Sequence, residues 1–99
     1  MSLYYDEKIK ILDSLGMEKY FIKPNKTNYR YKGKVIVREM REGSIVAYVW
    51  GRGFSSKYKY DARGWIHIHD FTEDQIRELI NEVKAHQDKI AIFNNKDGR

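Results

Sequence analysis

The sequence of 99 residues contains no cysteine, a single proline and no long apolar run. Without cysteine, the chain can form neither a disulfide framework nor a cysteine-based zinc site. No stretch approaches the roughly 18 apolar residues of a membrane-spanning helix. The N-terminus also lacks the apolar core of a signal peptide. We therefore expect a cytoplasmic protein without membrane contacts.

The sequence also lacks the short motifs by which many enzymes are recognised. It has no Walker loop, no Gly-x-Ser-x-Gly elbow, no His-Glu-x-x-His zinc motif and no dinucleotide-binding fingerprint. We expect no cofactor and no bound metal. A non-catalytic role is favoured, although the absence of these motifs does not decide whether the protein is an enzyme.

What the chain does have is an uneven distribution of charge. The net charge is +5. Residues 19–63 contain 12 basic and 3 acidic residues, a net charge of +9, so the remainder of the chain carries −4. A basic middle segment between mildly acidic ends is typical of a protein that binds a polyanion or an acidic protein surface.

Residues 64–83 give the clearest structural pattern. Thr72 and Gln75 have the spacing of a capping box at the start of a helix. The apolar residues of 76–83 then recur at the spacing of one buried helical stripe. Residues 65–69 alternate with a period of two, which predicts a strand with its isoleucines toward the core and its tryptophan and histidines on the other face.

The remaining segments predict an α+β fold in a single domain, residues 1–99. We expect an N-terminal helix at 3–15, a three- to four-stranded antiparallel sheet, and a C-terminal amphipathic helix packed on one sheet face. The expected strands are 29–32, 34–40, 45–50 and 65–69, with 20–23 as a possible short strand, 24–28 as a turn and 45–50 as a central strand. The long connection 51–64 is a candidate functional loop with a short edge strand at 57–60. Residues 88–93 would be an edge strand or an apolar tail, and 94–99 a frayed end.

Basic residues alternate with aromatic residues in the middle segment, as at 29–32 and 57–60. Nucleic-acid binding uses cations for phosphates and flat rings for exposed bases. We therefore predict a small accessory protein that binds DNA or RNA through a Lys/Arg/Tyr-rich sheet face and loop. The predicted phosphate contacts are Arg30, Lys32, Lys34, Arg52, Lys57, Lys59 and Arg63, and the predicted stacking rings are Tyr29, Tyr31, Phe54 and Tyr58.

Residues 64–83 resemble the C-terminal strand and helix of MmcQ/YjbR-type double-wing domains. The matching pieces are Gly64-Trp65-Ile66-His67-Ile68 and Asp74-Gln75-Ile76-Arg77-Glu78-Leu79-Ile80. The resemblance implies DNA binding as an expectation. The Ser-Tyr pair that usually closes that helix is replaced by Val83-Lys84, and no site residue is carried over.

Two other functions fit the same residues. A protein-interaction module, such as an inhibitor encoded by a phage or a mobile element, could dock on an acidic partner through Trp50, Phe54 and Trp65. Alternatively, His67 and His69 would project to the same side of a strand about 6–7 Å apart. That spacing could hold a metal or supply the acid and base of a small nuclease, with His86 as a third ligand if the fold brings it near.

Overall fold

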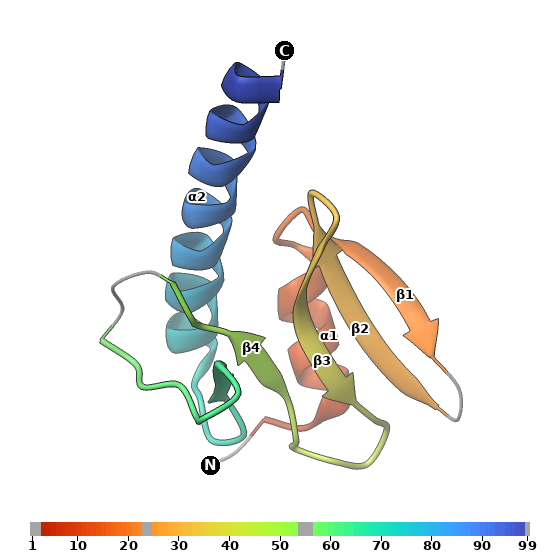
Figure 1. The fold of residues 1–99 in the computed structure, drawn as a ribbon. Helices are drawn as coiled ribbons and strands as arrows, with labels where there is room; N and C mark the ends of the chain where they lie inside the picture. The colour runs from red at the N-terminus through yellow and green to blue at the C-terminus, as the bar shows by residue number, and fades with distance from the viewer. Residues whose placement is uncertain (1–2, 23–24, 54–56, 99) are drawn as a thin grey trace.

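The computed structural model describes residues 3–22, 25–53 and 57–98 and shows the expected α+β architecture (Figure 1). The elements are α1 (Tyr5–Asp13), β1 (Glu18–Ile22), β2 (Lys26–Tyr31), β3 (Lys34–Met40), β4 (Tyr48–Trp50), β5 (Trp65–His67) and α2 (Glu73–Gly98). The strands form one antiparallel sheet in chain order, β1-β2-β3-β4-β5. The sheet therefore has one strand more than the upper end of the expected range.

Both helices pack on the same face of the sheet and close one hydrophobic core with it. The predicted stripe of α2 is confirmed, because Ile76, Leu79, Ile80 and Val83 all have 0% exposure. α1 contributes Ile11 and Leu12, and residues from β2 to β5 complete the cluster. Among the residues that the structure describes, no helix covers the opposite face of the sheet (Figure 1).

The start of α2 is fixed by the predicted capping box. The backbone N–H of Thr72 donates to Gln75 Oε1 at 2.9 Å, and the backbone N–H of Gln75 donates to Thr72 Oγ1 at 3.3 Å. The edge strand or tail predicted at 88–93 is wrong, because these residues continue α2. No proline or glycine interrupts the helix before Gly98. The helix also includes residues 94–98, where we expected a tail, and its C-terminal turns extend beyond the sheet (Figure 1).

Several strand boundaries differ from the predicted ones. Residues 26–28 belong to β2 and pair with β1, although they were predicted as a turn. The described residues of 57–60 form no strand, and β5 ends at His67. β4 contains only Tyr48–Trp50 and is the fourth strand, beside the edge strand β5, whereas β3 is the central one. In the part of the chain that the structure describes, no helix is long and apolar enough to cross a membrane.

A buried lysine ties the segment before β4 to α1. Lys8 of α1 has 0% exposure, and its Nζ donates to the carbonyl oxygens of Leu3 at 2.5 Å, Ile45 at 2.8 Å and His69 at 3.1 Å. The ammonium group has three donors, and all three are used. Lys8 therefore joins the N-terminal segment, the β3–β4 connection and the corner between β5 and α2.

β3 is irregular where it pairs with β2, and this irregularity decides which side chains face outward. The register shifts on both sides of Tyr29, and Glu39 has a φ of 70°. Ile36 and Val37 are consecutive, yet both have 0% exposure. A bulge inserts an extra residue into one strand and re-aims the side chains that follow it. The next residue, Arg38, pairs with Tyr48 on the outward-facing side of the sheet.

Candidate nucleic-acid interface

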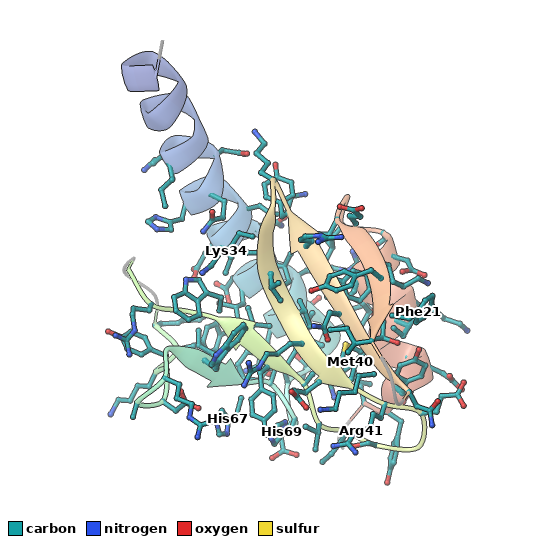
Figure 2. All side chains as sticks on the ribbon, turned by 45° about the vertical axis from the view of Figure 1, so that its right-hand side comes forward. Phe21, Lys34, Met40, Arg41, His67 and His69 are labelled. Atoms are coloured by element: carbon teal, nitrogen blue, oxygen red, sulfur yellow. The ribbon has the colours of Figure 1, made fainter. Side chains whose placement is uncertain are left out.

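The sheet face opposite the helices, which we call the open face, carries aromatic and basic side chains. Val49 and Ile66 form a cross-strand pair that points into the core, so the flanking pairs Tyr48–His67 and Trp50–Trp65 point away from it. The open face comprises Tyr20, Arg30, Lys34, Arg38, Tyr48, Trp50, Trp65 and His67, where Lys34 is included because its Nζ lies over Trp50. Figure 2 shows Lys34 at the start of β3 and His67 next to His69.

Cationic side chains lie against the rings of the open face. Lys34 Nζ is 4.0 Å from the centre of a Trp50 ring, and the guanidinium carbon of Arg38 is 4.5 Å from the centre of a Trp65 ring. On β1 and β2, the guanidinium carbon of Arg30 lies 4.2 Å from the ring centre of Tyr20. Such contacts contribute about 0.5–1 kcal/mol at exposed sites. They also restrict the positions that these long side chains can take.

The rings contact one another as well. Trp50 and Trp65 meet edge to face with ring centres 5.2 Å apart, and Tyr48 meets His67 in the same way at 4.8 Å. Edge-to-face packing is a favoured arrangement of aromatic pairs. The outward side chains of β4 and β5 therefore form an aromatic layer made of two cross-strand pairs.

A hollow of about 440 Å³ opens on this face beside the turn at residues 61–64. Its lining residues are Arg38, Glu39, Tyr48, Asp61, Ala62, Arg63, Trp65 and His67. The Nε of Arg38 is buried without a hydrogen-bond partner. Within the described ranges, neither Arg38 nor Arg63 donates a side-chain hydrogen bond or pairs with a carboxylate. Two guanidinium groups in the lining can therefore donate to a ligand.

The turn that walls the hollow is held by Asp61. Its Oδ1 accepts the backbone N–H groups of Arg63 at 2.9 Å and Trp65 at 3.0 Å, and its Oδ2 lies 2.9 Å from His67 Nε2. The hydrogen bond with His67, followed by the one from Trp65, lowers the pKa of Asp61 to about 2. Both carboxylate oxygens are thus occupied, and the turn has a fixed shape.

Gly64 completes this turn and supports the adjacent tryptophan. Its φ is +98°, which favours glycine, and a Cβ at this position would lie 2.8 Å from Trp50 Cζ3. The backbone therefore packs directly against the indole. Any larger residue at position 64 would displace either the turn or the Trp50 ring.

The predicted phosphate contacts are divided between two regions. Arg30, Lys34 and Arg63 lie at the open face or its hollow, although Arg30 Nε is also 3.4 Å from Glu18 Oε1. Arg52 donates to the carbonyl oxygen of Ala62 at 2.6 Å and so supports the turn. Lys59 is exposed.

Lys32 and Lys57 lie instead beside α2, where carboxylates neutralise them. Lys32 Nζ is 2.8 Å from Asp88 Oδ1, and Lys57 Nζ is 3.1 Å from Glu78 Oε1. Each carboxylate raises the pKa of its lysine above the ordinary value through a hydrogen bond. The expected convergence of positive charge is therefore partial, and these two lysines are separate from the open face.

The tyrosines predicted to stack on bases face the helices. Tyr29 has 0% exposure and its hydroxyl donates to Asp13 Oδ1 at 2.7 Å, so the prediction of a stacking role for Tyr29 is wrong. The hydroxyl of Tyr31 donates to Asp88 Oδ1 at 2.8 Å, and that of Tyr58 donates to Glu78 Oε1 at 2.9 Å. Both rings are therefore engaged with α2. Phe54 lies outside the described residues.

Sequence reasoning missed Arg38 and Tyr48 as members of the site and assigned Trp50 and Trp65 only to a protein interface. The alternation in 65–69 did place Trp65 on the face opposite the buried isoleucines. Arg38 carried no comparable pattern, because its direction depends on the β3 bulge.

The two neighbouring histidines have different environments. His67 is exposed and bonded to Asp61, whereas the Nδ1 of His69 accepts the backbone N–H of Ala47 at 3.2 Å. Burial, followed by the nearby charge of His67, lowers the pKa of His69. Among residues 3–22, 25–53 and 57–98, no three potential metal-ligating side chains come together. Since His69 uses Nδ1 internally, the pair is poorly suited to the joint acid–base role considered from the sequence.

No family model matches this chain, and no match is found among curated proteins or solved structures. The double-wing resemblance of residues 64–83 therefore gains no support from these comparisons.

Proposed function

We propose that this protein is a cytoplasmic nucleic-acid-binding protein that acts without catalysis and contacts its ligand through the open face. The observation that carries the proposal is the pair of cations held over tryptophans, Lys34 over Trp50 and Arg38 over Trp65. Within the described part of the chain, neither cation has a carboxylate partner.

Cations that are already held in position can bind a polyanion at a lower cost in conformational entropy. Binding a phosphate with a mobile lysine or arginine requires the side chain to lose conformational freedom, about 0.5–1.5 kcal/mol for each immobilised side chain. At the open face, the rings already restrain these side chains in the free protein. The aromatic layer beneath them also offers surface on which exposed bases can stack.

A protein partner with an acidic surface is the second candidate. Trp50, Trp65 and Arg38 are residue types that are enriched among interface hot spots, and all three are half-buried rather than fully buried. The two candidate functions can be distinguished by a binding experiment. Nucleic acid would bind as a purified oligonucleotide, whereas a partner protein would be captured equally well after nuclease treatment.

The test compares two double variants with the same change in net charge. Lys34→Gln with Arg38→Gln removes charge from the open face, whereas Lys32→Gln with Lys57→Gln removes it beside α2. Hydrogen bonds to charged groups contribute about 1.5–3 kcal/mol each. Fluorescence anisotropy with a mixed-sequence oligonucleotide should therefore show at least a tenfold loss of affinity, about 1.4 kcal/mol, for the first variant. The second should bind as the wild type does. Failure of the wild type to bind at low salt would reject the proposal.

A further inference from the structure

The hollow beside the 61–64 turn brings two arginines together with two aromatic rings. Arg38 and Arg63 line it from β3 and from the turn, and Tyr48 and Trp65 line it from β4 and β5. Its volume of about 440 Å³ is within the roughly 300–1,000 Å³ of small-molecule sites. The hollow therefore has the size of a small-molecule site and a lining that is both basic and aromatic.

The charges in the lining favour an anion. Glu39 is paired with Lys26 at 3.1 Å, and both oxygens of Asp61 are already hydrogen-bonded. The two arginines have no such partners among the described residues. A guanidinium group can form two parallel hydrogen bonds to a phosphate, which makes arginine well suited to phosphate recognition.

The rings in the lining favour a flat group beside that anion. Bases of single-stranded nucleic acids stack on aromatic rings and on the guanidinium planes of arginines. Here the guanidinium of Arg38 and the ring of Trp65 already lie against each other. A nucleotide carries a phosphate and a flat heterocyclic base on one sugar, and it therefore matches both parts of the lining.

A base inside a duplex is not available to such a hollow. It is stacked and paired, and bringing it out requires a few kcal/mol. We infer that the hollow binds one unpaired nucleotide, with its phosphate at Arg38 and Arg63 and its base against Tyr48 and Trp65. On this basis the protein prefers single-stranded nucleic acid to duplex. This inference rests on the proposed function of the open face.

The first experiment measures the affinity of the full chain for a labelled single strand and for a fully paired, blunt-ended duplex containing the same sequence. We expect the single strand to bind at least tenfold more tightly. Equal affinities would overturn the inference while leaving the proposed function intact. Absence of binding to both would overturn the proposed function and the inference with it.

The second experiment asks whether a single nucleotide occupies the hollow. AMP should shift the NMR signals of the Trp65 indole and the His67 ring and compete with the labelled strand. Adenosine and inorganic phosphate at the same concentration should have much weaker effects, because each supplies only half of the match. If AMP shifts neither signal, or if the three compounds act alike, the assignment of the hollow is incorrect.

A matched pair of variants connects the two experiments. Arg63→Gln changes an exposed side chain at the hollow, and Lys10→Gln removes the same charge from an exposed position on α1. Arg63→Gln should reduce the preference for single strands and the competition by AMP, each by about tenfold, whereas Lys10→Gln should leave both unchanged. Equal effects of the two variants would show that net charge, rather than the hollow, accounts for binding.

Discussion

The guanidinium of Arg38 lies 4.5 Å from the centre of a Trp65 ring, although the two residues belong to strands that are not neighbours in the sheet. The side chain of Arg38 therefore extends across β4 to reach β5. This contact depends on the β3 bulge that turns Arg38 outward. It links the central strand to the edge strand on the face that we propose as the binding surface.

Replacement of Trp65 by alanine should weaken binding to a single-stranded oligonucleotide by about tenfold or more. Stacking of one base on an aromatic ring is worth about 1–3 kcal/mol, and the variant also removes the support of Arg38. The measurement is fluorescence anisotropy at fixed salt, with folding verified by circular dichroism.

The matched control for this variant is Phe21→Ala. The ring of Phe21 has 72% exposure and belongs to a second hollow with Tyr5 and Thr27, on the helix side of β1. Its removal should leave the affinity unchanged. If Phe21→Ala were as damaging as Trp65→Ala, the open face would not be the binding surface.

Lys8→Met should destabilise the fold strongly. The variant keeps most of the side-chain volume but leaves three carbonyl groups without their hydrogen-bond donor, and each unsatisfied buried group costs about 1–3 kcal/mol. We expect a decrease of about 3 kcal/mol or more in the free energy of unfolding, measured with urea. Lys10→Met, at an exposed position of the same helix, should change it by less than about 0.5 kcal/mol. Similar stabilities of the two variants would contradict the assigned role of Lys8.

The contribution of Asp61 to stability should depend on pH in the acidic range. Its pKa is about 2 in the folded protein, below the ordinary value of 3.8. A carboxylate whose pKa is lowered by folding stabilises the folded state at pH values above its ordinary pKa. This stabilisation is lost as the pH falls toward the pKa in the folded protein. The stability difference between wild type and Asp61→Asn should therefore be constant at neutral pH and shrink between about pH 4 and pH 2. A difference that stays constant down to pH 2 would show that Asp61 is not held by these hydrogen bonds.

Tyr29 should resist ionisation in the folded protein. Burial, followed by the hydrogen bond to Asp13, raises its pKa above the ordinary value of 10.0. In an absorbance titration near pH 10, folded Tyr29→Phe should titrate like the folded wild type, whereas after unfolding the wild type should show one tyrosine more than the variant. Because the unfolded state ionises first, Tyr29 should lower the stability as the pH rises above 10. Loss of one ionising tyrosine from the folded protein in Tyr29→Phe would contradict the buried position.

The parts of the fold that follow from local chemistry were predictable from the sequence. The capping box and the apolar stripe of α2 depend on residues within a few positions of one another, and both are present in the structure. The end of α2 was not predictable in the same way. Residues 88–93 are apolar enough for a strand, and only their continuity with the preceding helix decides between the two conformations.

The composition of the site was less predictable, because it depends on contacts between distant strands. The alternation of 29–32 correctly separated Tyr29 from Arg30, but tyrosine suits both a core and an open surface, so the pattern did not reveal which side the helices cover. The burial of Lys8 was likewise not predictable from the sequence, since a lysine on an amphipathic helix is normally exposed. Its burial becomes evident only when the carbonyls of Ile45 and His69 are placed around it.

The most direct test of the central claim is the salt dependence of binding to a single strand. Each phosphate contact contributes about 0.7 to the slope of log affinity against log salt concentration. Removing the open-face cations in Lys34→Gln with Arg38→Gln should make the slope shallower by about 1.4, whereas Lys32→Gln with Lys57→Gln should retain the wild-type slope. Equal slopes for the two double variants, or a shallower slope for the α2-side variant, would contradict the claim that the open face contacts the phosphates.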